Sequence, residues 1–188
     1  HVIDGVLDAG LAPIATCGGQ NLYADYDGHY LYVAAPGVSA TSGLDHFLLV
    51  ARTTTTGTSA APWAKAGTAA AWDLFIGNED SNNFSAWFNA SGGQVTAGLT
   101  KASGAMIEGL IDVAAVWGSA PAAVRVAFAG YASPDGGALQ AQAPCGNGNG
   151  TLEVGEWATF NLATTDLPDG GGEAGARVIA LLSGNPVR

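Results

Sequence analysis

Short runs of apolar residues, many alternating with polar ones, follow one another along the chain and are separated by Gly, Pro, Asn or Asp. The clearest example spans residues 21–35, where the Asp27-Gly28 pair stands between two runs rich in aromatic and apolar residues. Such a pair is a strong signal for a β-hairpin, because Gly accepts the positive φ of a type I′ turn. The pattern therefore predicts an all-β protein.

The same pattern predicts about twelve short strands, and this number favours a two-sheet β-sandwich of the jelly-roll type. No amphipathic helix is expected, because Pro62 and Gly67 interrupt the Ala-rich stretch 60–71. The predicted strands are Val2–Leu7, Asn21–Tyr26, Tyr30–Ala35, Phe47–Arg52, Ala70–Ile76, Phe84–Asn89, Gln94–Leu99, Met106–Val113, Val124–Tyr131, Ala138–Ala143, Thr159–Leu162 and Arg177–Leu182.

The 188 residues suit one domain, 1–188, with a sizeable core. A Gly-rich segment at 168–172 precedes the last predicted strand, and we interpret it as a hinge that lets this strand pair locally or with a neighbouring molecule. The two terminal strands carry few of the charges or prolines that protect sheet edges. We therefore expect self-association into an oligomer or filament through Val2, Ile3, Val6, Val178, Ile179 and Leu181.

Charged residues make up only 12% of the chain, against roughly 25% in ordinary domains. The surface must therefore consist largely of Ala, Gly, Thr, Ser and Asn. Sixteen acidic and six basic residues give a net charge of -10, which argues against nucleic acid as a partner and is compatible with divalent cations. No apolar run approaches the ~20 residues of a membrane span.

The chain begins at His1 rather than at Met, as an exported chain does after its signal peptide is removed. Its two cysteines, Cys17 and Cys145, lie in Gly-rich loops. An isolated pair of cysteines in an oxidising compartment usually forms a disulfide. We therefore predict a secreted, extracellular or cell-surface protein with a Cys17–Cys145 bridge, the alternative being two free thiols.

Several short motifs in the first quarter of the chain resemble the start of β-sandwiches of the carbohydrate-binding-module family 9-like or DOMON-like type. The resemblance implies an extracellular, non-catalytic module, often appended to enzymes or surface proteins, and it assigns no ligand site. The motifs are Ile3-Asp4-Gly5-Val6-Leu7-Asp8, Leu22-Tyr23-Ala24, Gly28-His29-Tyr30-Leu31-Tyr32-Val33-Ala34 and Asp45-His46-Phe47.

Residues 145–156 can be aligned with a calcium-binding loop in which Gly150 forms the sharp turn. Cys145 stands where such a loop has its first Asp, so any affinity should be modest. The alternative is a Gly-rich turn that holds its shape without an ion. The candidate ligands are Asn147, Asn149, Thr151, Glu153 and Glu156.

An N-terminal His offers an amine and an imidazole, and with a second His it could bind copper; His1, His29 and His46 are the candidates for this minor alternative. No nucleophile elbow, zinc-protease motif or phosphate-binding loop is present. The acids that could form a glycosidase pair are scattered, so we do not expect an enzyme. They are Asp73, Glu79, Glu108 and Asp112.

Five tryptophans complete the set of candidates. Trp72, Trp87 and Trp157 lie in or beside apolar alternation and are predicted to be core residues. Trp63, in a loop, is the best candidate for a ring that stacks on a sugar or a partner, and Trp117 is ambiguous. Two hypotheses result: a self-associating structural subunit, which the low charge and terminal strands favour, and a carbohydrate-binding module with exposed aromatics.

Overall fold

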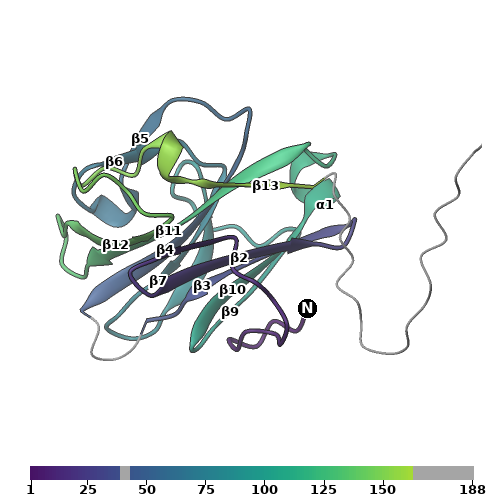
Figure 1. Cartoon of the computed structure of the whole chain (residues 1–188), viewed down its shortest axis with the longest axis horizontal. Coiled ribbons are helices and arrows are strands. Elements are labelled where there is room, and N and C mark those ends of the chain that lie inside the picture. Colours follow the sequence, from purple (N-terminus) through teal and green to yellow (C-terminus); the bar gives the residue numbers. More distant parts are fainter. Residues whose placement is uncertain (39–42, 163–188) are drawn as a thin grey trace, which may run out of the picture.

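The computed structural model describes residues 1–38 and 43–162. They form two antiparallel sheets packed face to face, so the prediction of an all-β sandwich is confirmed (Figure 1). The predicted hinge at 168–172 and the predicted strand Arg177–Leu182, with Val178, Ile179 and Leu181, lie outside the described residues.

The first sheet has the strand order β1-β2-β3-β10-β9. The second has the order β12-β11-β4-β7-β8, and β13 pairs with β11 on the side where β12 also pairs. Strands β5 and β6 form a separate two-stranded ribbon. The bounds are β1 Ala15–Cys17, β2 Gln20–Tyr26, β3 Tyr30–Pro36, β4 Leu44–Arg52, β5 Thr58–Ala60, β6 Thr68–Ala70, β7 Leu74–Asn78, β8 Ser85–Asn89, β9 Leu99–Ser103, β10 Met106–Asp112, β11 Ala123–Ala132, β12 Leu139–Ala143 and β13 Ala158–Asn161.

Three short helical turns connect these strands: η1 (Pro62–Ala64), α1 (Val113–Trp117) and η2 (Val154–Glu156). Helix α1 begins where the Asp112 carboxylate accepts a hydrogen bond from the Ala115 N–H, and it ends at Gly118 with φ 77°. No helix in the described ranges is long and apolar enough to cross a membrane.

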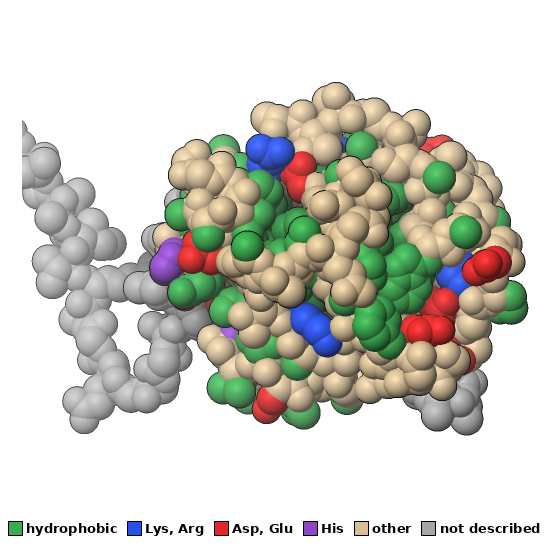
Figure 2. Space-filling view, turned by 180° about the vertical axis from the view of Figure 1, so that it is seen from behind, with side chains coloured by type: hydrophobic (Ala, Val, Ile, Leu, Met, Phe, Trp, Pro, Cys, Tyr) green, Lys and Arg blue, Asp and Glu red, His purple; other side chains and the backbone are tan. Residues whose placement is uncertain are grey.

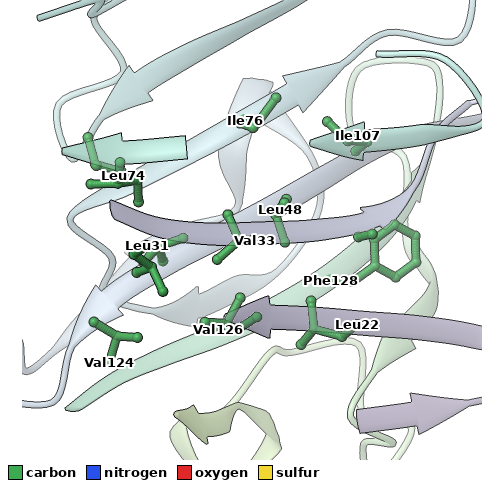
Figure 3. Close-up of a cluster of buried hydrophobic side chains, with 14 of the residues drawn as sticks. Leu22, Leu31, Val33, Leu48, Leu74, Ile76, Ile107, Val124, Val126 and Phe128 are labelled. Carbon is green, nitrogen blue, oxygen red and sulfur yellow. The ribbon is translucent and has the colours of Figure 1, made fainter. Parts of the chain in front are cut away.

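The main core lies between the two sheets, where apolar side chains from both inner faces meet (Figure 3). Strand β4 shows how the sequence builds it: Leu48 and Val50 point into this core, while Phe47 and Leu49 belong to a second cluster on the outer face. Both faces of β4 are therefore buried, which explains its unbroken apolar run. Residues 61–72 and 152–157 contribute to the cover over the outer cluster.

The prediction of a strand at Val2–Leu7 is wrong. This segment lies across the outer face of the first sheet (Figure 1), where Ile3 packs against the cluster of Tyr23, Tyr32 and Ala34. Its Asp4 and Gly5 N–H groups donate to the fully buried Glu108 carboxylate, at 3.0 and 2.6 Å, instead of to a neighbouring strand. Gly5 has φ +88°, which a regular strand does not allow. Hydrogen bonds to a buried carboxylate have therefore replaced strand pairing.

Burial and the hydrogen bond that Tyr32 donates to Glu108 raise the pKa of Tyr32 well above its ordinary value of 10.0. Of the terminal residues expected to mediate assembly, Ile3 is partly buried against the outer face of the first sheet, whereas Val2 and Val6 are each 61% exposed.

Two other predicted strands need correction. Residues 94–99 form a single bridge at Gln94 followed by turns, and β9 begins only at Leu99. The predicted strand Ala70–Ile76 is two strands, because β6 ends at Ala70 and β7 begins at Leu74. Between them the Asp73 carboxylate accepts the Arg52 N–H, and this contact fixes the break.

Candidate functional site

Two aromatic side chains, Trp63 and Phe84, lie beside each other at the surface next to the outer cluster of the second sheet. Their ring centroids are 6.4 Å apart with an interplanar angle of 34°. Phe84 is 42% exposed and Trp63 is partly buried. We call this pair the aromatic shelf.

The backbone that presents the aromatic shelf is strained. Among the described residues, positive φ values outside glycine occur only at Trp63 (50°), Ala64 (55°) and Asn83 (56°). All three belong to or adjoin the shelf. A bulky residue in this region costs on the order of 1–3 kcal/mol and persists only where the surroundings enforce it. Such strain is found most often at binding and catalytic sites.

The Trp63 ring is supported from below by Gly77 of β7. A Cβ at Gly77 would lie only 2.3 Å from Cζ2 of Trp63, so only glycine leaves room for the indole. Phe47 and Phe88 contact the same ring edge to face, with centroid distances of 5.0 and 5.6 Å. Trp63 is therefore more firmly packed than the freely exposed ring expected from the sequence. Phe84 supplies the more exposed half of the shelf.

A buried ion pair anchors the loop that carries Trp63. The Lys65 Nζ lies 2.7 Å from Asp45 Oδ2 and also donates to the backbone carbonyls of Ala132, Ser133 and Pro134. Both side chains are almost fully buried. Four oxygen acceptors surround one ammonium, which satisfies the buried charge and fixes the residue two positions after Trp63.

The loop that carries Phe84 is fixed by amide side chains. Asn78 donates to the side-chain oxygen of Asn83 at 2.8 Å, and the Phe84 N–H donates to Asn82 Oδ1 at 2.6 Å. Asn tolerates the left-handed conformation better than most residues, which explains its presence at position 83. The shelf is thus held on both sides before any ligand arrives.

A second feature is a groove of about 670 Å³ at the edge of the sandwich, where β1 of the first sheet meets β12 of the second. We call it the edge groove. Its lining comes from the turn between β1 and β2, from residues 138–142 and from the loop at 146–150. None of the described residues that line it is charged.

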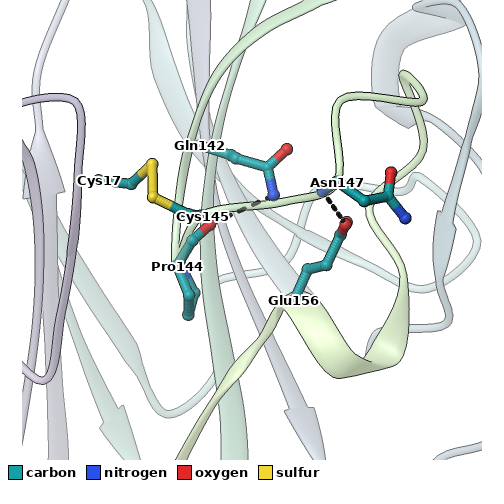
Figure 4. Close-up of a disulfide and its surroundings, with 6 residues drawn as sticks. All are labelled: Cys17, Gln142, Pro144, Cys145, Asn147 and Glu156. Carbon is teal, nitrogen blue, oxygen red and sulfur yellow. Dashed lines mark hydrogen bonds between the residues drawn. A yellow bond between two sulfur atoms is a disulfide. The ribbon is translucent and has the colours of Figure 1, made fainter.

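The predicted disulfide is confirmed: Cys17 and Cys145 are bonded, and they join the end of β1 to the segment after β12 (Figure 4). Cys17 itself lines the edge groove. Because the bridge links the two sheets, it fixes the distance between the two walls of the groove.

The predicted calcium loop closes with hydrogen bonds of its own (Figure 4). Glu156 accepts the N–H groups of Asn147 and Glu153, at 2.7 and 3.0 Å. Glu153 accepts from the side-chain amides of Asn147 and Asn149. Each Asn side-chain oxygen accepts a hydrogen bond from the backbone N–H two residues later in the chain. The Asn149 N–H donates to Asn147 Oδ1, and the Thr151 N–H donates to Asn149 Oδ1. The proposed ligands therefore hold the loop by themselves, and calcium binding stays a prediction.

The three candidate copper ligands have separate surroundings. The His1 imidazole stacks on Tyr32 and lies 2.8 Å from both Asp8 and Asp25. His29 lies 3.5 Å from Asp112. His46 is buried, with Nδ1 2.9 Å from the carbonyl of Pro36. Within residues 1–38 and 43–162, no group of three or more His, Cys, Asp or Glu side chains could hold a metal ion.

Two of the scattered acids are engaged in structural contacts. Burial raises the pKa of Asp73, but hydrogen bonds from Arg52 and Thr55 outweigh this effect and hold the pKa below its ordinary value of 3.8. Glu108 is buried beneath the N-terminal segment. Trp117, at the end of α1, packs against the main core rather than forming part of the aromatic shelf.

Charged side chains are sparse on the face of the molecule that Figure 2 shows, in keeping with the 12% charged composition. No protein-family model, curated protein or solved structure matches the chain. Function is therefore inferred from the geometry of the aromatic shelf and the edge groove.

The sequence predicted Trp63 as a candidate ring and missed Phe84, which alternation placed at the start of a strand. The Asn82-Asn83 pair before Phe84 was the available signal, since two successive Asn favour a turn. Gln20 and Gln140 of the edge groove were also missed, and no local motif marks them.

Proposed function

We propose that the protein is a non-catalytic, extracellular module that binds a neutral polysaccharide on the aromatic shelf. The observation that carries the proposal is the strained backbone at Trp63, Ala64 and Asn83, which presents two adjacent aromatic rings at the surface. A sugar ring has an apolar face of C–H groups that can stack on an aromatic ring, and hydroxyl groups around its edge. A surface that offers aromatic rings beside polar groups matches both features.

Polar groups adjoin the aromatic shelf. Asn82 and Asn83 are exposed beside Phe84. The Trp63 indole N–H has no hydrogen-bond partner among the described residues. It is not among the fully buried polar atoms that lack a partner, so a sugar hydroxyl can reach it. The net charge of -10 disfavours an anionic polysaccharide, which leaves a neutral one as the better partner.

The disulfide supports an extracellular location, because such bridges persist in oxidising compartments. A non-catalytic module of this kind also agrees with the resemblance of the first quarter of the chain to carbohydrate-binding sandwiches.

The proposal is tested by incubating the full chain with insoluble neutral polysaccharides, namely cellulose, xylan, mannan, chitin and β-1,3-glucan, and measuring the protein left in solution. We expect depletion by at least one of them, and weaker depletion for Phe84→Ala. Val154→Ala, which shortens another exposed apolar side chain, is the matched control. Equal depletion of all three proteins would contradict a role for the shelf.

Self-association is the second candidate, and the edge at β13 favours it. The other sheet edges are protected: β1 has three residues, β9 carries Lys101, β12 contains a bulge, and residues 93–95 run beside β8. Strand β13 has no Lys, Pro or bulge. Deleting residues 163–188, which contain Val178, Ile179 and Leu181, should abolish association in sedimentation velocity if that segment pairs with β13 of a second copy.

A further inference from the structure

We infer that the edge groove is a second, independent subsite for the same neutral polysaccharide, which rests on the proposed function. One subsite in the edge groove and one on the aromatic shelf would let the chain hold two polysaccharide strands or two parts of one strand. The inference starts from two amide side chains, Gln20 and Gln140, that line the edge groove and have no hydrogen-bond partner in the described part of the chain.

A β-bulge directs Gln140 away from the regular ladder. Ala141 pairs with Gly130 and Leu139 pairs with Tyr131, so no residue of β11 stands opposite Gln140. Its side chain is exposed. Bulges are common beside binding sites, where the extra residue changes the direction of a side chain. Gln140 thus faces the groove from the second sheet, and Gln20 faces it from the first.

Other parts of the wall are bare backbone. Cβ atoms built at Gly18, Gly148 and Gly150 would meet no atom within 4 Å, and all three have positive φ. A ligand can therefore approach the main chain closely at these points, where backbone N–H and C=O groups can bond to hydroxyls. Leu139 adds an apolar surface to the lining.

The edge groove is formed before a ligand binds. The disulfide fixes its two sides, and the Asn147 and Asn149 turns hold the loop at 146–150. Gln142 packs over Gly146 and donates to the Pro144 carbonyl, which fixes the base of that loop. A preformed site loses less entropy on binding than a flexible one. The volume of about 670 Å³ lies within the range of small-molecule sites.

The uncharged lining selects the ligand class. Amides, glycine backbone and one leucine offer hydrogen bonds and apolar contact without a charge to pair with a phosphate, carboxylate or ammonium. The hydroxyl groups of a neutral glycan both donate and accept, so they match amides at every position. The same class of ligand suits the aromatic shelf.

Isothermal titration of the full chain with neutral hexasaccharides of β-1,4-glucose, β-1,4-xylose, β-1,4-mannose and β-1,3-glucose tests the inference. We expect two hexasaccharides per chain for the unmodified protein and one for the double variant Gln20→Ala/Gln140→Ala. Neither side chain has a hydrogen-bond partner within residues 1–38 and 43–162, so the fold should tolerate their truncation, which a melting curve checks. Gln94→Ala, an exposed glutamine outside the groove, is the matched control and should leave the stoichiometry at two.

The outcomes separate this inference from the proposed function. If the unmodified protein binds one hexasaccharide, and this binding is lost in Phe84→Ala but not in the groove variant, the shelf is a binding site and the inference about the edge groove is wrong. If the single bound hexasaccharide is lost only in the groove variant, the edge groove is a binding site and the proposed role of the shelf is wrong. No binding of any hexasaccharide would overturn both.

Discussion

Gly77 lies directly beneath the indole of Trp63, and a methyl group at position 77 would come within 2.3 Å of that ring. A glycine in the middle of a strand usually weakens the strand, so its presence in β7 has a specific reason. Here the reason is room for an aromatic ring at the surface.

Gly77→Ala should therefore displace Trp63. Overpacking of this kind costs ~1–3 kcal/mol of unfolding free energy, and the displaced ring should weaken polysaccharide binding. Gly109→Ala is the matched control, because its methyl group would meet Trp87 at the same 2.3 Å within the main core. Chemical denaturation and depletion assays should show both variants destabilised and only Gly77→Ala impaired in binding. If both variants lost polysaccharide binding equally, their lower stability alone would explain the loss of binding.

Removing the disulfide should destabilise the chain substantially. The bridge spans 128 residues, and replacing both Cys17 and Cys145 by Ala should lower the unfolding free energy by about 4–5 kcal/mol in the chain-entropy model. Urea denaturation of the double variant measures the change, and non-reducing peptide mapping of the unmodified protein provides the control. A double variant as stable as the unmodified protein would show that the bridge adds nothing to stability.

Glu156 should stabilise its loop without calcium. Glu156→Gln weakens hydrogen bonds to the N–H groups of Asn147 and Glu153, and we expect a loss of about 1–3 kcal/mol. Asp135→Asn, at an exposed acid, should change nothing. Melting curves of the unmodified protein should coincide in calcium and in EGTA. A melting temperature that rises with calcium would support the predicted ion site instead of the turn that holds its shape without an ion.

His46 should make stability depend on pH. Burial lowers the pKa of His46 below 6.5 and outweighs the opposing effects of the Pro36 carbonyl, Asp80 and Asp45. The unfolded chain then binds this proton more readily than the folded chain. The contribution of His46 is complete above pH 6.5 and is lost as the pH falls through the lower folded pKa.

The pH dependence is measured by proton NMR of the imidazole and by the unfolding free energy between about pH 7.5 and about pH 5. We expect a titration midpoint below 6.5 for His46. His46→Gln should have a shallower loss of stability toward acid. A midpoint above 6.5 would contradict the assignment.

Local patterns predicted the fold well where hydrogen bonds are made between strands. The β2–β3 hairpin follows from Asp27-Gly28, and β4 and β11 follow from their apolar runs. The pattern failed at Val2–Leu7, because its apolar residues cover a sheet face while its N–H groups bond to Glu108, 103 residues away from Gly5. No local pattern contains that information.

The candidate site was predictable only in part. Trp63 between Pro62 and Ala64 suggested a loop aromatic, and the loop cysteines suggested the bridge. The aromatic shelf, however, needs Gly77 and Phe84 beside Trp63, and the edge groove needs the turn after β1 beside β12. These juxtapositions depend on how the strands are ordered in the two sheets, and strand spacing does not specify that order.

The most direct test of the central claim is a binding isotherm of the full chain on whichever neutral polysaccharide retains it, repeated for Trp63→Ala, Phe84→Ala and the control Val154→Ala. Loss of a buried aromatic contact at a binding hot spot costs about 2 kcal/mol, or roughly 30-fold in affinity. We predict a weakening of this order for both shelf variants, with circular dichroism spectra like that of the unmodified protein, and an unchanged affinity for Val154→Ala. Unchanged affinity in both shelf variants, or no retention by any neutral polysaccharide, would contradict the proposed function.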